Sequence, residues 1–349
     1  MYQRDISPPR SSPIEKGSPI FGTWTRPFDD VDLLSIKHPF YLPTMKWVRN
    51  LRVKEWQTFH IQNETYFLIA VLTNAKYYRL AQVFLWNKET KESLLFRKSL
   101  PFGAWKLPRS LSNSSITSRS YGFYFRIHNW LDADLIELDL DIEPNRKRPS
   151  FTAHIEFDFS RLKTTPLVTC LPFSDRRCMY NYKAMVPVRG DLVFGGKHVS
   201  LSLDNTFGFF MDYKGYFPYR MRQTWCTGHG YHNDGRPFGF SVVESQTRDS
   251  FRYNENGLWL AGQLTPLPPV RITMPEGPDS DWVIQDLEGM VDLTFTPKEP
   301  IKTGFDFFLT RSEYIAPFGV YNGMLQTKDG EKINIRNIWG TGEQIYLRV

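Results

Sequence analysis

The stretch from Ile136 to Ser160 reads IELDLDIEPNRKRPSFTAHIEFDFS, and its alternation decides the fold class. The apolar positions that share one face are Ile136, Leu138, Leu140 and Ile142 in the first half, and Phe151, Ala153, Ile155, Phe157 and Phe159 in the second. Charged and polar residues occupy the positions between them. A period of two is typical of antiparallel strands with one face in water. The turn residues 145–149 separate the halves, so the sequence predicts a β-hairpin.

The same texture recurs along most of the chain, and helical periodicity is almost absent. Asp-Gly pairs at 234–235 and 329–330 suit tight hairpin turns between strands. A short segment from Ser174 to Tyr180 is the only helix that the pattern predicts. Many short strands joined by short turns are typical of sandwiches and barrels, so the fold class is all-β.

The chain has 349 residues, which favours two units over one small core. The stretch RLKTTPLVTCLP, from Arg161 to Pro172, breaks the alternation and carries two prolines. We therefore predict a barrel over 21–165 and a second barrel over 166–349. The first residues, 1–20, are rich in Pro and Ser and are predicted to form a disordered arm.

Composition excludes some classes of protein. The net charge is +6, but the longest basic run is RKRP at 146–149, and a nucleic-acid binder should show a basic stripe. No apolar run approaches the roughly 18 residues that span a bilayer. There is no apolar signal segment at the start and there are three cysteines, so we expect a reducing, cytoplasmic location. Oligomeric state is left open.

Familiar catalytic motifs are missing as well. The sequence has no G-x-G-x-x-G opening a helix, no P-loop, no G-x-S-x-G, no H-E-x-x-H and no C-x-x-C. His229 and His232 lie among glycines in a predicted loop, and two loop histidines do not complete a metal site. We therefore expect no cofactor and no metal.

Aromatic residues make up 15% of the chain, and rings line pockets for apolar ligands. They gather in DYKGYFPYRMRQTW, residues 212–225, where Tyr219 and Trp225 face one way and Arg220 the other. Arg220 either lies in solvent or sits at a barrel mouth, where it would bind a carboxylate, phosphate or enolate oxygen. Trp225 either seals the barrel or lines a pocket. Trp56, in KEWQTFHI, is a further candidate ring for ligand binding.

The segment NENGLWLAG supplies a candidate acid, Glu255, with Asn256 and Trp259 close by. A glutamate beside a tryptophan in an apolar barrel would have a raised pKa and could protonate an alkene or a carbonyl. The alternative is a turn cap or a salt bridge, to Arg220 or Arg222.

Three other residues are candidates for acid–base work. His229 at a barrel mouth could be a general acid or base near neutral pH. His60 is a second histidine candidate, although a lone strand histidine more often serves packing. Glu343, just before the last predicted strand, is either a second interior acid or part of a polar surface.

These motifs, in this order, resemble the domain-of-unknown-function family 2804, a group within the calycin-like proteins. The resemblance runs from about Phe21 to Arg348 and rests on GTWTRP, KEWQTFHI, VFLWNKETKE, DYKGYFPYRMRQTW, NENGLWLAGQL, VDLTFTP, PFGVYNGMLQTKDGEKINI and a final Gly-x-Gly-Glu. The long N-terminal arm and the segment CTGHGYHND depart from the usual pattern.

The resemblance implies two lipocalin-like antiparallel β-barrels in tandem. The wider group is similar to carotenoid 1,2-hydratase-like and AttH-like proteins, whose members handle polyenes, prenyl lipids or polyketides, including hydration and cyclisation by protonation of a double bond. The resemblance to the family also implies that the pair Glu255 and Asn256 lies at a position that recurs among its members. Lys183 and Asp212 match family motifs too, and an ion pair is their simplest role.

Together these observations predict a protein that binds a hydrophobic small molecule in a ring-lined barrel cavity. In an enzyme of this kind, acid–base chemistry without a cofactor would hydrate, isomerise or cyclise the bound molecule. Glu255 would be the acid, and Trp225 would stabilise a carbocation. A lipid carrier or scaffold without catalysis is one alternative. A carbohydrate-active enzyme with paired carboxylates is another.

Overall fold

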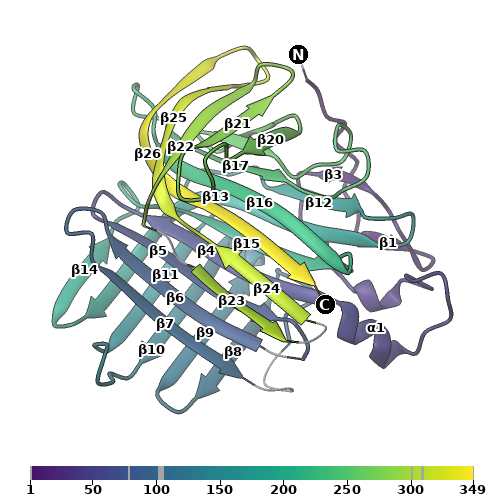
Figure 1. Ribbon diagram of the computed structural model, residues 1–349, viewed down its shortest axis with the longest axis horizontal. Coiled ribbons are helices and arrows are strands. Elements are labelled where there is room, and N and C mark those ends of the chain that lie inside the picture. Colours follow the sequence, from purple (N-terminus) through teal and green to yellow (C-terminus); the bar gives the residue numbers. More distant parts are fainter. Residues whose placement is uncertain (1, 78, 101–105, 300–301, 308–309, 349) are drawn as a thin grey trace.

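The structure is a computed structural model, which describes residues 2–77, 79–100, 106–299, 302–307 and 310–348. It is nearly all-β, with 4% helix and 57% strand, as the alternation predicts. Two large antiparallel sheets, each curled into a half-barrel, pack against each other (Figure 1).

The first sheet lies in the lower part of Figure 1. Its main path runs through β7 (Ser93–Leu100), β6 (Arg79–Asn87), β5 (Tyr66–Asn74), β4 (Lys54–Gln62), β15 (Phe207–Gly215), β13 (Cys178–Phe194), β11 (Phe151–Asp158), β10 (Leu135–Ile142), β9 (Phe123–Trp130) and β8 (Ser114–Ser120). Three more strands join this path at its side: β12 (Leu167–Pro172), β14 (Lys197–Leu201) and β3 (Gly22–Trp24). A separate ribbon pairs β1 (Ile14–Glu15) with β2 (Ser18–Pro19).

The second sheet lies above the first in the same view. It runs through β19 (Gln263–Pro266), β18 (Gly257–Leu260), β17 (Pro237–Glu244), β16 (Arg220–Tyr231), β26 (Lys332–Arg348), β25 (Phe318–Gln326), β22 (Val291–Glu299), β21 (Trp282–Asp286) and β20 (Val270–Thr273). The hairpin of β23 (Lys302–Phe307) and β24 (Thr310–Ile315) joins it through β26.

The hairpin predicted from the alternating stretch is confirmed. β10 pairs with β11 in a register that sets Ile136 opposite Phe157 and Leu138 opposite Ile155. These apolar residues belong to the core inside the curl of the first sheet, while the acidic positions between them face outward. Both Asp-Gly pairs also lie in turns, between β16 and β17 and between β25 and β26, where the glycines take φ values of +83° and +87°.

The chain changes sheets between β15 and β16, at residues 216–219. The predicted domain boundary between 165 and 166 lies earlier, and β12 to β15 extend the first sheet beyond it. Because β15 pairs with β4, which lies much earlier in the chain, the segment from β12 to β15 belongs to the first sheet. As a limit between independently folding units, the boundary stays a prediction.

The helix predicted from Ser174 to Tyr180 is wrong. This segment is a tight turn that leads into β13, because the Ser174 hydroxyl accepts the backbone N–H groups of Arg176 and Arg177. The helices of the described residues are α1 (Lys46–Arg52) and the short 3₁₀ turns η1 (Leu33–Ser35) and η2 (Leu131–Ala133).

The central strands of the first sheet are buried on both faces. In β13, Tyr182 points into the core enclosed by this sheet, whereas the neighbouring Met185 faces the second sheet. In β15, Phe210 and Met211 divide in the same way. This double burial explains the near-continuous apolar runs in these strands. It also makes the space between the sheets a second apolar interior.

The prediction of a disordered arm over 1–20 is wrong for the described residues 2–20. The Tyr2 side chain is 3% exposed, and its hydroxyl donates to the Phe251 carbonyl at 2.7 Å. The Arg4 guanidinium donates to the carbonyl oxygens of Asn254, at 3.0 Å, and Leu267, at 2.6 Å. A Pro- and Ser-rich composition indicates low intrinsic order, but it carries no information about partners far away in the chain.

We therefore predict that Arg4→Met lowers the free energy of unfolding by about 1.5–3 kcal/mol, because it removes hydrogen bonds from a charged donor. Urea titration would measure the loss. Arg10→Met is the matched control on the same arm, since Arg10 pairs with the exposed Glu15, and its cost should stay below about 1 kcal/mol. Equal effects of the two variants would contradict a docked arm.

Candidate functional site

A cavity of about 190 Å³ lies between the two sheets. Residues of β4, β5, β6, β7 and β15 form one wall, and residues of β16, β24 and β26 form the other. The sequence predicted a ligand cavity inside a barrel. The position differs because alternate residues of the first sheet leave its own core and meet the second sheet.

Strand β4 sets the long axis of the cavity. Its alternate residues Lys54, Trp56, Thr58 and His60 all line the space. Beyond His60, the Gln62 side-chain amide donates to the backbone carbonyl of His229 in β16, which aligns the two strands across the interface. Lys54 and His60 are the first and last of these lining residues in β4, and their positions are called the two ends of the cavity below.

Aromatic rings form a continuous wall in the middle. Trp56 stacks on Tyr213, with ring centroids 4.9 Å apart and an interplanar angle of 20°. It also stacks on Phe217, at 5.3 Å and 24°. Trp225, which is 9% exposed, lines the cavity from the second sheet. Of the rings predicted for ligand binding, Trp56 and Trp225 are therefore in the cavity wall.

The His60 end holds a cluster of three titratable side chains. His60 Nε2 lies 3.4 Å from Glu343 Oε1, and the Tyr314 hydroxyl donates to Glu343 Oε2 at 2.7 Å. Burial lowers the pKa of His60, while the Glu343 carboxylate acts in the opposite direction. Burial and Glu343 raise the pKa of Tyr314. Glu343 thus lines the cavity with two hydroxyl donors, Tyr314 and Thr341, and one imidazole beside it, a set that can exchange a proton with a bound molecule.

A second polar network lies behind the ring wall, fully buried. The Glu255 Oε2 atom is 2.8 Å from Lys183 Nζ and accepts the Tyr213 hydroxyl at 2.7 Å. It also accepts the side-chain amide of Asn181, and Lys183 Nζ donates to Ser241 Oγ at 3.0 Å. Burial lowers the pKa of Lys183, and Glu255 opposes this shift. Tyr213 belongs to both the network and the cavity wall, so the network is linked to the cavity through one phenol.

The cation predicted for Glu255 is therefore wrong: Lys183, not Arg220 or Arg222, is its partner. Arg220 is exposed at the start of β16, whereas β13 carries Lys183 through the dry interface. Lys183 and Asp212 do not pair with each other either, since Asp212 pairs with Lys214 at 3.1 Å. Neighbouring strand positions point to opposite faces, which separates the two pairs.

Four other predicted site residues do not line the cavity. Asn256 is structural, because its amide bonds the Val243 N–H and the Pro268 carbonyl at 2.7 and 2.8 Å. Trp259 is fully buried and donates to the Thr165 carbonyl at 2.8 Å. Tyr219 is 48% exposed. His229 lies in β16 rather than in the predicted loop, and its Nε2 is 2.9 Å from the Phe207 carbonyl.

Sequence reasoning missed Lys183, Asn181, Tyr213 and Tyr314 as parts of these clusters. A signal for the first two was present: in CMYNYKAMV, from 178 to 186, Asn181 and Lys183 share a strand face with methionines. Two polar residues on an otherwise apolar face require partners. The partner itself, Glu255, is 72 residues away from Lys183, and no spacing rule connects them.

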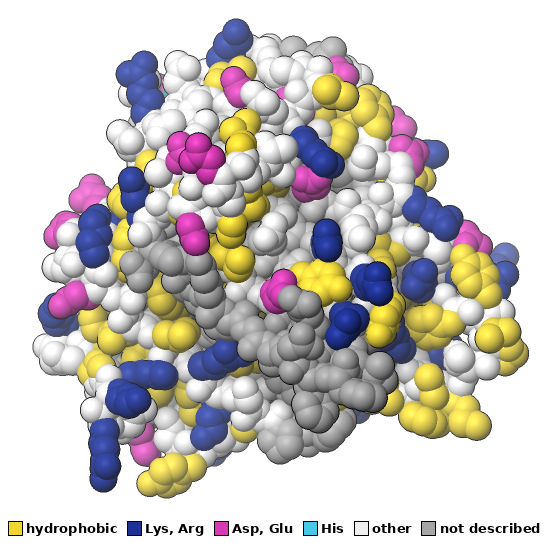
Figure 2. All heavy atoms as spheres, viewed as in Figure 1, with side chains coloured by type: hydrophobic (Ala, Val, Ile, Leu, Met, Phe, Trp, Pro, Cys, Tyr) yellow, Lys and Arg dark blue, Asp and Glu magenta, His cyan; other side chains and the backbone are white. Residues whose placement is uncertain are grey.

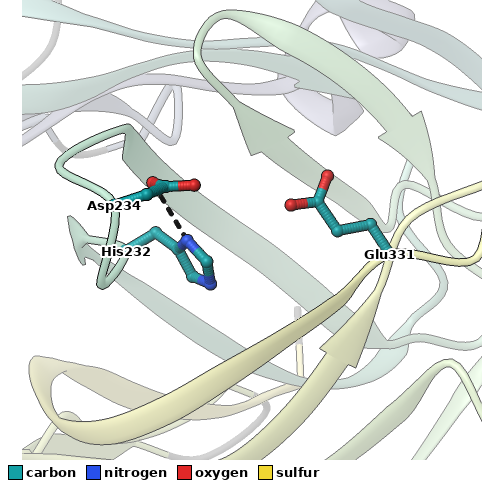
Figure 3. Close-up of side chains that lie close together, drawn as sticks. All are labelled: His232, Asp234 and Glu331. Atoms are coloured by element: carbon teal, nitrogen blue, oxygen red, sulfur yellow. Dashed lines mark ion pairs between the residues drawn. The ribbon is translucent and has the colours of Figure 1, made fainter.

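One group of potential metal ligands consists of His232, Asp234 and Glu331, which Figure 3 shows facing a common space. His232 Nδ1 lies 3.0 Å from Asp234 Oδ1. The Arg236 guanidinium pairs with both carboxylates, Asp234 at 2.6 Å and Glu331. The Arg236 guanidinium therefore offsets one of the two carboxylate charges and occupies oxygens that a metal ion would need.

The surface has a mixed character. On the face shown in Figure 2, basic side chains are interspersed with acidic and apolar ones. Arg220 and Arg348 are register partners near the C-terminal end. Among the described residues, no helix combines the length and apolar character needed to cross a membrane.

Comparisons with known proteins found one matching family and several solved structures that are similar to this chain. The profile of the family described as "Domain of unknown function (DUF2804)" matches residues 3–349. A crystal structure of CghA with Sch210972 is similar, with a TM-score of 0.53 and 11% identity over 85% of this chain and 88% of that chain. Kievitone hydratase from Nectria haematococca gives a TM-score of 0.46 and 12% identity over 84% and 88% of the two chains. No curated protein matches the chain.

We predict that Lys183→Met and Glu255→Gln each cost about 3–5 kcal/mol of unfolding free energy, because each leaves a buried partner uncompensated. The double variant should lose less than the sum, by roughly 0.5–3 kcal/mol. Chemical denaturation of the four proteins tests this. Arg109→Met, which breaks an exposed pair with Asp30, is the control and should cost less than about 1 kcal/mol.

The buried His229 gives a prediction for acid stability. Burial lowers its pKa from 6.5 to about 3. At pH values between these two, His229 binds a proton in the unfolded chain but not in the folded protein. The free energy of unfolding therefore keeps its full value above pH 6.5 and decreases as the pH falls below it. His229 alone should lower the free energy of unfolding by about 1.4 kcal/mol for each pH unit.

Unfolding free energies from pH 7 down to pH 4.5 would check this in the native protein, in His229→Gln and in a control variant, His198→Gln. His198 is exposed and paired with Asp191. The free energy of unfolding should depend less steeply on pH in His229→Gln, and in this variant only. Parallel curves for all three proteins would show that His229 does not stay neutral in the fold.

Proposed function

The chain belongs to the family described as Domain of unknown function (DUF2804), and we propose that it binds an apolar small molecule between its sheets and transfers a proton to it without a cofactor. The observation that carries the proposal is the cluster of His60, Glu343 and Tyr314 at one end of a ring-lined cavity. Titratable groups in a largely water-free space are suited to acid–base chemistry.

In this proposal Glu343 is the acid. Its protonated carboxyl gives the proton to one carbon of a carbon–carbon double bond, and the other carbon becomes a cation. The rings of Trp56 and Trp225, which line the same cavity, can stabilise that cation through their faces. Water that adds to the cation loses a proton to the Glu343 carboxylate, which completes a hydration and restores the acid. Attack by a second double bond begins a cyclisation, which ends when a proton leaves the new cation for the same carboxylate. Return of a different proton to the carboxylate gives an isomerisation.

His60 and Tyr314 would position the Glu343 carboxyl group against the ligand. Because burial lowers the pKa of His60, its imidazole is favoured in the neutral form, which can face the Glu343 carboxyl group at 3.4 Å without removing the proton that the reaction needs. Glu255, the acid favoured by the sequence, is fully buried and meets the cavity only through Tyr213. We therefore assign Glu255 to positioning Tyr213, and His229 to packing.

A carbohydrate-active enzyme fits the cavity less well than this proposal does, and an experiment separates a carrier from an enzyme. Within the described residues, Glu343 is the single carboxylate in the cavity wall, whereas a glycosidase needs two. A carrier without catalysis would use the same cavity and would leave its ligand unchanged. CghA, a protein of similar fold, was crystallised with a small molecule, Sch210972, and this likeness supports ligand binding here as a proposal.

The test begins with native mass spectrometry of the protein purified from its own host, to identify what it carries. The ligand is then incubated with the native protein, Glu343→Gln or His60→Gln in D₂O. We expect hydration to add the mass of one D₂O, and isomerisation or cyclisation to add deuterium at carbon. Both variants should slow this change by roughly a hundredfold or more, because a positioned acid or base commonly supplies that factor.

Affinity for the ligand, followed by tryptophan fluorescence, should survive Glu343→Gln, since the substitution keeps the shape of the side chain. Glu244→Gln is the control: Glu244 pairs with Arg271 outside the cavity wall. A ligand that binds but never gains deuterium would establish a carrier and refute catalysis.

A further inference from the structure

The end of the cavity opposite His60 holds a lysine with unusual surroundings. The Lys54 residue is 5% exposed and lines the cavity. Its Nζ donates to the backbone carbonyls of Leu51, at 2.7 Å, and Ala75, at 2.9 Å. It also lies 4.4 Å from the centre of the Tyr77 ring. Two of the three N–H groups of the ammonium are thus used, and both acceptors are uncharged.

Of the four other buried lysines among the described residues, three have a carboxylate partner, and the fourth, Lys88, lies outside the cavity wall and donates to the backbone carbonyl of Asn63. Lys76 pairs with Glu55, Lys183 with Glu255 and Lys214 with Asp212. For Lys54, no carboxylate among the described residues lies within ion-pair distance. The one carboxylate of the described cavity wall, Glu343, lies at the His60 end. A buried cation without a counter-ion is costly, and a site that retains one is expected to receive an anion.

We propose that Lys54 binds the carboxylate of the ligand, which makes the ligand an elongated, apolar carboxylic acid. The inference rests on the proposed function, because it places the acid end at Lys54 and the reacting double bond at His60 and Glu343. Lys54 and His60 are six positions apart in β4, which at the rise of an extended strand is about 20 Å. The apolar part of the ligand would lie along Trp56 and Met211 in between.

The size of the cavity agrees with a slender molecule. A volume of about 190 Å³ is smaller than the roughly 300–1,000 Å³ typical of pockets for drug-sized ligands. A single chain suits such a space better than fused rings do. Met211 and Met221 in the wall are flexible side chains that can adjust to its width.

The charges around Lys54 support an anion further. Burial lowers its pKa to about 7, and the neighbouring cations Arg52 and Lys76 lower it in the same direction. The other titratable residues of the described cavity wall are Tyr77, Arg97, Tyr213, His60, Tyr314 and Glu343. The second sheet contributes the apolar Met221 and Leu347 to the cavity wall. A bound carboxylate would restore the protonated form of Lys54 and add a charge-assisted hydrogen bond through its third N–H.

The experiment compares two probes of equal length, dodecanoate and dodecanol, by isothermal titration calorimetry at pH 7. The native protein should bind dodecanoate at least tenfold more tightly than dodecanol, since a hydrogen bond to a charged group is worth about that factor or more. Lys54→Met should remove this preference and leave dodecanol affinity unchanged. Lys54→Gln keeps a donor for the two carbonyls and should therefore stay folded, which circular dichroism would check. If it also loses the preference for dodecanoate, unfolding is not the cause.

Lys98→Met is the matched control, because it removes the same charge from β7 at a position outside the cavity wall. It should keep the native preference. Equal affinity for acid and alcohol in the native protein would overturn the carboxylate site while leaving the apolar cavity, and so the proposed function, intact. Saturable binding of neither probe would overturn both.

The pH dependence gives a second readout. Above the pKa of about 7 for the free protein, carboxylate binding requires Lys54 to take up a proton. The affinity for dodecanoate should therefore fall by up to about tenfold per pH unit from pH 7.5 to pH 9, while that for dodecanol stays constant. The slope should vanish in Lys54→Gln. A slope that persists in this variant would mean that another group holds the acid.

Discussion

The ion pair between Lys183 and Glu255 joins the two sheets at a point that water does not reach. Lys183 lies in β13 of the first sheet, and Glu255 lies just before β18 of the second. Each charge is fully buried, so each would be very unfavourable alone, and the pair is tolerated only while the sheets stay in one relative position. The phenol of Tyr213 and the amide of Asn181 satisfy the same carboxylate oxygen. This requirement fixes the interface in which the cavity is formed.

Double burial of the first sheet has a functional consequence. Since β4 and β15 send alternate side chains to each face, the same strands build a closed core and the wall of a cavity. The cavity then has two different ends on one strand. His60, close to Glu343, supplies a proton-transfer group at one end, and Lys54 supplies a cation at the other. A rigid strand holds both at a fixed separation, which is the property that positions a long ligand against a reacting group.

Local pattern predicted much of the fold. The alternation in 136–160 gave the β10–β11 hairpin and its buried face, and both Asp-Gly turns lie where expected. It also predicted that Trp225 and the arginines of β16 face opposite ways, which the burial pattern confirms. Composition misled at 1–20, because Tyr2 and Arg4 are held by residues about 250 positions away. The helix at 174–180 failed because one serine hydroxyl stabilises a turn instead.

The sequence named Trp56, Trp225 and Glu343 only as candidates, with other roles open for Trp225 and Glu343, and the structure places all three in the cavity wall. What the sequence by itself determined is the all-β class and the alternating faces. These follow from side-chain periodicity, which each strand carries alone. Only the tertiary structure decided that Glu255 pairs with Lys183, that His60 meets Glu343, and that Lys54 has no carboxylate partner among the described residues. The physical reason is that ionic partners and cavities depend on how two distant sheets pack, and antiparallel pairing brings together residues whose separation in the chain follows no fixed spacing.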